Sequence, residues 1–282
     1  MKFKVFSELT YVATTPATFI FNIHAAKTAN QQILEESFSV SPDIYYEIFS
    51  LGNNGIRFVK LELYVPLTFT ITYQAQVEVS HEVINESTLS TPTSIMQLDP
   101  GVIPFLYPSR HCQSDKIYKL AQSEFGNAGT IFQQVNAINE WIYQHIEYLG
   151  GSTNSGTSAY DTLTQREGVC KDFAHLGIAL CRALDIPARY FTGYAYDLNP
   201  PDFHACYEAY IGGRWIFFDA TKLVPINGLV KIANSKDAAE AAVASFFGSA
   251  MCTFMNIQCE VMDENFVPYL LTPDTTEGIA YT

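Results

Sequence analysis

The sequence of 282 residues predicts an α+β protein, in which an all-β amino-terminal region precedes helices that pack on an antiparallel sheet. Two observations predict this class. In the first third of the chain, apolar residues occupy every second position in one segment after another, which is the pattern of strands with one face in water. After about residue 110, apolar residues recur at three- and four-residue spacing, which indicates helix faces, and a predicted β-hairpin follows.

The clearest predicted strand runs from Leu67 to Val79, where apolar residues alternate with threonine, glutamine and glutamate. The same alternation occurs in segments 19–23 and 59–65. This pattern predicts a β-sandwich with one wet face per sheet. Its predicted turns lie at Pro16, Ser41-Pro42 and Gly52-Asn53-Asn54-Gly55.

A change of composition marks a predicted connection between two domains. Residues 86–109 are rich in serine, threonine and proline and carry few charges. They also contain apolar residues, so we expect the connection to pack on the surface rather than hang free. These residues are Ile95, Met96, Leu98, Val102, Ile103, Phe105 and Leu106. The predicted organisation is a β-sandwich domain at 1–85, a surface-packed linker at 86–109 and a second domain at 110–282.

The second domain is predicted to begin with helices and to end in weaker signals. Helices are expected at about 114–126 and 131–146, where the second carries a core stripe of apolar residues. Near the end of the chain, 237–243 predicts a short helix and 253–261 predicts a returning strand.

Cys170 opens another predicted helix of this domain. Gly168 permits a sharp entry into the helix, and the apolar residues that follow share one helix face. Unpaired N–H groups and the positive end of the helix dipole favour an anion here, so we expect Cys170 to be held as a thiolate. The same N–H groups suit an oxyanion formed on a carbonyl group. Cys170 is therefore a candidate nucleophile.

His204 and Asp219 lie in two segments that predict a β-hairpin around Gly212-Gly213. With these two glycines as the loop, counting back from the turn makes Asp219 the diagonal neighbour of His204 on one face of the sheet. A three-residue loop instead places the two side chains on opposite faces. The chain order of cysteine, histidine and aspartate suggests a nucleophile, a base and an orienting carboxylate.

Several motifs in this region occur together in one family. They are Thr157 to Leu163, Arg166 to Leu176, Ile186 to Tyr190, Gly193-Tyr194, Asp202 to Ala205, and Trp215 to Thr221. In order and spacing they resemble the core of bacterial transglutaminase-like proteins. The resemblance covers roughly 108–248, and the β-rich region before it is similar to the amino-terminal domain that often accompanies this core.

The resemblance implies a papain-like α+β fold in which Cys170 is the nucleophile, His204 is the general base and acid, and Asp219 orients the imidazole. Members of this superfamily include crosslinking transglutaminases, cysteine peptidases, amidases and inactive relatives. Two residues depart from the family pattern. Ala220 stands where proline is usual, and Cys206 stands where an aromatic or small residue is usual.

These residues predict acyl transfer on a peptide or carboxamide bond of a peptide or protein substrate, through a thioester intermediate. Hydrolysis by a cysteine peptidase or amidase is favoured because water is the abundant acceptor. The alternatives are a protein-glutamine transglutaminase with an amine acceptor and a non-catalytic binding protein on the same fold. The backbone N–H of Cys170 supplies one oxyanion donor, and Tyr160 and Asp161 are candidates for the rest of the cleft. The resemblance makes 110–282 the catalytic domain.

A zinc site made of Cys170, His175, His204 and Cys206 is a competing interpretation. Cysteines paired at a two-residue spacing are absent, and His175 lies five residues after Cys170 on a different helix face. His175 is therefore predicted to be a packed helix residue. Neither a metal nor another cofactor is expected.

Charge and cysteine usage limit the remaining function classes. A net charge of −13 without a basic stripe argues against nucleic-acid binding. No apolar run is long enough for a bilayer and no signal peptide is evident, so we expect a cytoplasmic protein without a membrane partner. The six cysteines are scattered, which fits a reducing compartment. Cys181, Cys252 and Cys259 are expected to be buried structural residues, and the oligomeric state is left open.

Overall fold

The computed structural model describes residues 1–52, 54–89 and 94–281. Asn53 of the predicted turn and positions 90–93 of the predicted linker lie outside the described residues. The strands are β1 (Lys2–Ala13), β2 (Ala17–Phe21), β3 (Gln31–Ser41), β4 (Tyr46–Ser50), β5 (Arg57–Leu63), β6 (Leu67–Val79), β7 (Glu82–Asn85), β8 (Glu147–Tyr148), β9 (Glu167–Gly168), β10 (Ala188–Ala195), β11 (Phe203–Ile211), β12 (Arg214–Phe218), β13 (Leu229–Ser235), β14 (Ala244–Phe247), β15 (Ala250–Val261) and β16 (Glu277–Ala280). The helices are α1 (Glu86–Leu89), α2 (Ser114–Phe125), α3 (Ile131–His145), α4 (Ala159–Gln165) and α5 (Cys170–Ala183), with short 3-10 turns at Ile95–Gln97 and Ile103–Leu106.

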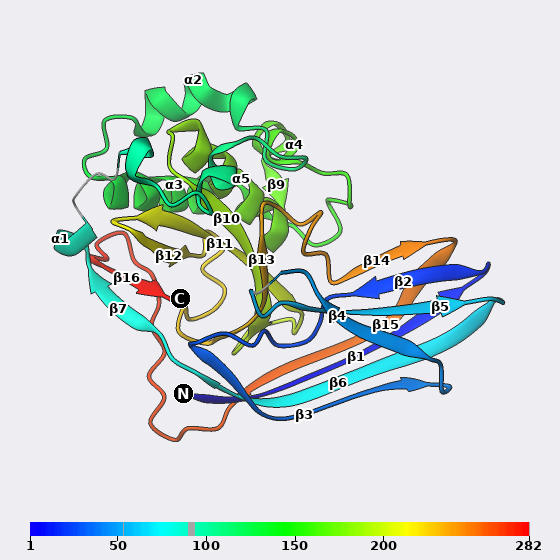
Figure 1. Ribbon diagram of the computed structural model, residues 1–282. Helices are drawn as coiled ribbons and strands as arrows, with labels where there is room; N and C mark the ends of the chain where they lie inside the picture. The colour runs from blue at the N-terminus through cyan, green and yellow to red at the C-terminus, as the bar shows by residue number, and fades with distance from the viewer. Residues whose placement is uncertain (53, 90–93, 282) are drawn as a thin grey trace.

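Two four-stranded antiparallel sheets form the lower part of the molecule in Figure 1. Their strand orders are β15-β1-β6-β3 and β14-β2-β5-β4. Aromatic rings join the two sheets face to face, because the Phe19 ring of β2 lies 5.5 Å from Tyr11 of β1 and 4.9 Å from Phe69 of β6. Such edge-to-face contacts favour tight packing of a sandwich core.

The alternation of apolar residues determines which face of each strand is buried. Strand β6 spans the predicted Leu67–Val79, and its apolar positions from Phe69 onward are buried at every second residue. In β5 the alternation ends at Leu63, because the next apolar position, Val65, is 61 % exposed beyond the strand. The predicted β-rich start of the chain is therefore confirmed, but the strand predicted at 59–65 begins and ends two residues earlier, at Arg57–Leu63.

The carboxy-terminal part of the chain returns to the amino-terminal sheets. Strand β15 pairs along the whole length of β1, and β14 pairs with β2. Figure 1 shows these two late strands, in orange, beside the blue strands from the start of the chain. The strand predicted at 253–261 is confirmed, but it completes the sandwich rather than the sheet that contains His204. In the opposite direction, β7 joins the later sheet through β16.

The second half of the chain builds a six-stranded antiparallel sheet, β13-β10-β11-β12-β16-β7, with the helices gathered above it in Figure 1. Helix α5 is almost entirely buried between this sheet and the other helices. Gly177 allows the close approach, because a Cβ at this position would lie 2.6 Å from Cε1 of Tyr207 in β11. The predicted α+β class is thus confirmed. Among the described residues, no helix combines the length and apolarity that crossing a membrane requires.

The predicted linker packs on the surface through part of its apolar set. Leu98 and Val102 are buried against Trp215 of β12, and the Phe105 ring lies 5.2 Å from the same indole. Met96 instead is 92 % exposed. Leu89, before the undescribed residues 90–93, is buried as well, so the described part of 86–109 packs on the protein at both ends.

The short helix predicted at 237–243 is wrong, because this segment forms turns. Asp237 begins it, and its carboxylate accepts hydrogen bonds from the backbone N–H groups of His111 and Ala239. These long-range and local bonds stabilise an irregular backbone in place of the helix that the alanine content favours.

Candidate functional site

Cys170 is the first residue of helix α5 and is half-buried. The preceding Val169 donates its backbone N–H to Oδ2 of Asp172 at 3.0 Å, and the Asp172 carboxylate also accepts from Thr153 and Lys171. A Cβ at Gly168 would lie 2.8 Å from Cβ of Asp172, so only glycine fits the entry to the helix. The buried capping carboxylate and this glycine together fix the sulfur at the tip of the helix.

The hairpin β11–β12 places His204 and Asp219 together. Gly212 and Gly213 form the predicted two-residue loop, both with positive φ, and Ile211 pairs with Arg214. Nε2 of His204 lies 2.9 Å from Oδ2 of Asp219. Both residues are buried, and the prediction that they share one face of the sheet is confirmed.

Asp219 is held from two sides. Its Oδ1 accepts hydrogen bonds from the backbone N–H of Thr221 at 2.9 Å and from the Thr221 hydroxyl at 2.7 Å. Its backbone carbonyl accepts from Nδ2 of Asn139 in α3 at 3.2 Å. The carboxylate therefore has one oxygen assigned to Thr221 and the other to His204, which fixes the plane of the imidazole.

The second imidazole nitrogen of His204, Nδ1, has no hydrogen-bond partner among the described residues. The thiols of Cys170 and Cys206 both lie beside the imidazole, and of these two Cys170 is the one that is not fully buried. Burial disfavours the charged imidazolium, but the neighbouring Cys206, Asp219 and Cys170 outweigh it and raise the pKa of His204 well above its ordinary value. The sulfur of Cys170, the imidazole of His204 and the carboxylate of Asp219 thus lie one beside the next, with the imidazole in the middle. Such an arrangement can deliver a thiolate and exchange a proton with a reacting group.

A cleft of about 620 Å³ opens beside Cys170 and His204. One wall belongs to α5 and to strands β10 and β11 of the six-stranded sheet, and the opposite wall is formed by β1 and β15 of the sandwich. The second wall contributes Leu9, Tyr11, Cys252, Thr253, Phe254 and Met255. The amino-terminal sheet and the returning strand therefore complete the site.

Comparison with known proteins agrees with this geometry. Residues 1–101 match the model of the bacterial transglutaminase amino-terminal domain, and residues 118–220 match that of the transglutaminase-like superfamily. A crystal structure from Cytophaga hutchinsonii, named a putative cysteine protease, is 54 % identical; the match covers 100 % of this chain and 98 % of that chain with a TM-score of 0.98. The chain belongs to the bacterial transglutaminase family.

Two uncharacterised mycobacterial proteins are similar over a shorter stretch. One from Mycobacterium leprae is 35 % identical over 100 residues, and one from Mycobacterium bovis is 34 % identical over 88 residues. These matches cover 33 % and 31 % of this chain. The matched part of this transglutaminase-like chain spans about a third of the length of these relatives: 36 % of the Mycobacterium leprae protein and 28 % of the Mycobacterium bovis protein.

Tyr148 is a neighbour of Cys170 that the sequence did not reveal. Its phenol oxygen lies within hydrogen-bonding reach of the backbone of Cys170, because the parallel bridge β8–β9 pairs Tyr148 with Gly168. Burial and the neighbouring Cys170 raise the pKa of Tyr148 to about 12, so the phenol keeps its proton at neutral pH. Two strands of two residues each leave no periodic signal from which this pairing could be predicted.

The two cleft residues predicted from sequence next to Cys170 lie elsewhere. Asp161 is the capping residue of α4, where its Oδ2 accepts hydrogen bonds from the backbone and hydroxyl of Ser158. Tyr160 is 42 % exposed on the same helix, and Lys116 lies over its ring. Neither residue lines the cleft among the described residues. The helix-capping signal of Ser158 and Asp161 explains their place better than a role at the cleft.

Cys181, Cys252 and His175 are all predicted to be buried or packed, and the structure buries Cys181 and His175 but not Cys252. Cys181 is buried as predicted, but Cys252 is exposed and lines the cleft, since β15 carries it to the edge of the sandwich. His175 is buried against Tyr190, as expected of a packed helix residue. Among the described residues, ligand atoms of His204, Cys206 and Asp219 lie within 4.8 Å of one another. These residue types can bind zinc, but His175 of the competing zinc interpretation is not among them. Two of the three, His204 and Asp219, are hydrogen-bonded to each other.

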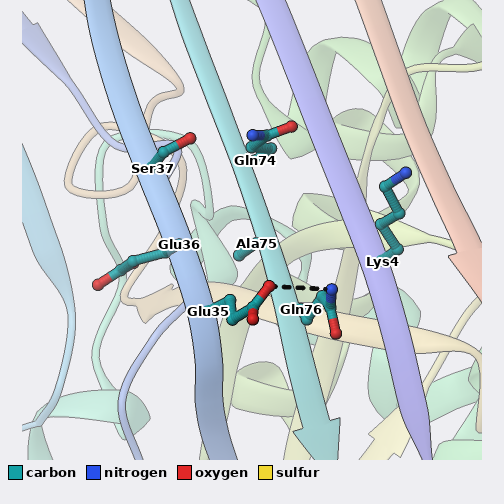
Figure 2. Close-up of a pocket in the computed structure, with 7 residues that line it drawn as sticks. All are labelled: Lys4, Glu35, Glu36, Ser37, Gln74, Ala75 and Gln76. Atoms are coloured by element: carbon teal, nitrogen blue, oxygen red, sulfur yellow. Dashed lines mark hydrogen bonds between the residues drawn. The ribbon is translucent and has the colours of Figure 1, made fainter.

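Another hollow, of about 440 Å³, lies on the first sandwich sheet, where Lys4 of β1 and Gln74 and Gln76 of β6 line it together with residues of β3. Figure 2 shows Glu35 hydrogen-bonded to Gln76, while Glu36 points away toward the other side of β3. A shift of register between Ile33 and Glu35 deforms β3 here. None of the residues that line this hollow lines the cleft beside Cys170, and no cysteine or histidine is among them.

Proposed function

We propose that this protein is a cysteine-dependent acyl-transfer enzyme that acts on peptide or carboxamide bonds, chiefly as a peptidase or amidase. The observation that carries the proposal is the position of His204, whose Nε2 is bound to Asp219 while its Nδ1 has no partner among the described residues and the half-buried thiol of Cys170 lies beside the ring. The group opens into a cleft whose far wall is apolar. Exposed Phe254 and Met255 on that wall suit a peptide chain.

The proposed reaction begins when the thiolate of Cys170 attacks the carbonyl carbon of the substrate. The negative charge then develops on the carbonyl oxygen, where the Cys170 N–H and the Tyr148 hydroxyl are the proposed donors. His204, as the imidazolium, gives its proton to the nitrogen of the departing amine, and the C–N bond breaks to leave a thioester on Cys170. His204 next takes a proton from water, the resulting hydroxide attacks the thioester, and the acid leaves as the thiolate reforms.

One feature of the cleft favours a second acceptor, a primary amine. The carboxyl group of Asp202 lines the cleft close to His204. Burial raises the pKa of Asp202, so a neighbouring ammonium group would relieve the cost of its charged form. An amine bound there would attack the thioester in place of water, and the protein would act as a transglutaminase.

The decisive experiment incubates the wild-type protein and Cys170→Ala with a peptide library, with and without a primary amine. We expect wild-type protein alone to give new peptide fragments or deamidated products, detected by mass spectrometry. Amine adducts as the main products would instead favour transfer. Equal inactivity of the two proteins would contradict the enzymatic proposal and favour a binding protein on this fold.

Iodoacetamide at about pH 6 should label Cys170 at least tenfold faster than any other cysteine, because the helix terminus and the His204 imidazolium favour the thiolate. The raised pKa of His204 keeps the imidazolium present through neutral pH. Mass spectrometry of time points measures the rates. Cys252 is the internal control, since it is exposed in the same cleft without an imidazole partner that holds it. Equal labelling of Cys170 and Cys252 would contradict the thiolate assignment.

Tyr148→Phe should lower kcat by about 10²-fold with little change in KM, because it removes a donor that acts on charge formed in the transition state. Steady-state kinetics on a substrate found with the library measures both constants. Tyr160→Phe is the matched control, because Tyr160 is a tyrosine of nearly equal exposure whose ring lies under Lys116, whereas Tyr148 lies next to Cys170. A similar loss in both variants would show that Tyr148 has no special role.

A further inference from the structure

A second cavity, of about 820 Å³, continues the cleft beside Cys170. The two cavities share lining residues at their junction, namely Lys171, Tyr190, Thr192, Val243 and Ala244. One side of the second cavity is formed by residues of the turn segment 238–243 and by strand β14, and the other carries Arg110, His111 and the loop around Asn154. Its volume suits a peptide segment with a side chain.

The charge of this cavity differs from that of the whole chain. The sequence has 29 acidic and 16 basic residues, yet the described lining of the cavity contains no aspartate or glutamate. Its two cations are Lys171, which is paired with Asp172, and Arg110. Arg110 is exposed and forms no ion pair with any residue that the structure describes. An anionic group in the cavity would therefore meet an uncompensated guanidinium.

Another pocket that adjoins the cleft has the reverse charge. This smaller pocket, of about 210 Å³, shares Asp202 with the cleft and is also lined by Asp197 and Glu260. No lysine or arginine lines it among the described residues. The cleft beside Cys170 thus adjoins a basic cavity and an acidic pocket through different lining residues, so a peptide with charged side chains would favour one orientation.

His175 supplies a neutral donor to the second cavity. It is 1 % exposed, and its Nε2 accepts the backbone N–H of Ala238 at 3.1 Å, so the ring hydrogen is on Nδ1. Nδ1 has no hydrogen-bond partner in the described residues. Burial and the stacked His111 lower the pKa of His175 to about 3, so the ring is neutral and donates. A buried donor without an acceptor favours a ligand that carries an oxygen acceptor.

We propose that the cavity lined by Arg110 and His175 binds an acidic side chain of the peptide whose carbonyl group reacts at Cys170. Arg110 would pair with the carboxylate, and Nδ1 of His175 would donate to an oxygen of the same segment. The apolar wall of Val243, Phe246 and Phe247 would contact the aliphatic part of the chain. This inference rests on the proposed function and narrows its substrates to peptides with an aspartate or glutamate near the reacting amide.

The test measures binding without chemistry, using the full-length Cys170→Ala variant. The probes are fluorescein-labelled peptides Ala-Xaa-Gln-Ala-Ala and Ala-Ala-Gln-Xaa-Ala, in which Xaa is glutamate, glutamine or lysine. We expect the glutamate peptide to bind at least tenfold more tightly than the lysine peptide in one of the two series, by fluorescence anisotropy. Arg110→Glu should reverse that order, and Arg110→Lys should largely retain it.

Lys119→Glu is the matched control, because it makes the same change of charge at an exposed residue of α2 that does not line the cavity. Equal binding of glutamate and lysine peptides, no measurable binding of any glutamate peptide, or the same reversal in Lys119→Glu would overturn the assignment. Selective binding without turnover by the wild-type protein would contradict only the proposed reaction. Turnover without selectivity would contradict only the cavity assignment.

Discussion

Asp219→Asn should lower kcat by about 10⁴-fold while the protein stays folded. In the wild-type protein, Oδ2 accepts the Nε2–H of His204, which leaves Nδ1 free to exchange a proton with Cys170. The backbone N–H of Thr221 donates to Oδ1, so an asparagine would place its oxygen there and turn its NH₂ group toward His204. A donor in that position selects the tautomer with hydrogen on Nδ1, which blocks proton transfer from the thiol.

The pH profile gives a second measure of the same change. Asp219 is among the neighbours that, against the effect of burial, raise the pKa of His204. If the active form is the thiolate with the imidazolium, kcat/KM falls as pH rises through the pKa of His204. The alkaline limb of kcat/KM should therefore move to lower pH in Asp219→Asn.

Asp161→Asn is the control for this substitution, since its carboxylate caps helix α4 and does not line the cleft. We expect its kcat to stay within about threefold of the wild-type value. Wild-type activity in Asp219→Asn, or an unchanged alkaline limb, would remove Asp219 from the proposed mechanism. Circular dichroism of each variant checks that the fold is retained.

The sequence allowed prediction wherever a local pattern determines the structure. The alternation of apolar and polar residues in 67–79 predicted a strand, and Gly212 and Gly213 predicted the hairpin loop that places Asp219 beside His204. The helix beginning at Cys170 was likewise predicted from its apolar periodicity. In each case the residues that decide the geometry are neighbours in the chain.

The missed features depend on contacts between distant segments. Strand β15 was predicted, but its pairing with β1 joins residues more than two hundred positions apart and carries no local signal. That pairing decides that Cys252 is exposed in the cleft instead of being a core residue. Tyr148 reaches Cys170 only through a two-residue parallel bridge. The failed helix at 237–243 likewise depends on a bond from His111, far away in the chain.

The same long-range pairing gives the amino-terminal sheets a place in the site. Because β1 and β15 form one wall of the cleft, loosening of the sandwich would open the substrate side while leaving Cys170, His204 and Asp219 in place. In the proposed reaction the two regions would divide the work: the six-stranded sheet and α5 hold Cys170 and His204, and the sandwich completes the wall of the cleft that a substrate would meet.

Glu208→Ala should lower the free energy of unfolding by about 3–5 kcal/mol, because it leaves buried cations without their counter-charge. Glu208 is 0 % exposed in β11, and its Oε2 lies 2.5 Å from Nε of Arg189. Lys231 of β13 is buried in the same group; burial, against the attraction of Glu208, lowers the pKa of Lys231 to about 8. Without Glu208, the Arg189 guanidinium and the Lys231 amine would lie inside the protein with no carboxylate to balance them.

The matched comparison is Glu82→Ala, which removes the same residue type from an ion pair with Arg214 at the surface. Both partners of that pair are about half exposed, so water replaces the lost contact and the expected cost is about 0–1 kcal/mol. Urea unfolding followed by tryptophan fluorescence measures both variants. Trp215, which stacks with Arg189 at 4.1 Å, reports on the buried cluster directly. Equal stabilities of the two variants would contradict the inference that buried charges hold β10, β11 and β13 together behind the site.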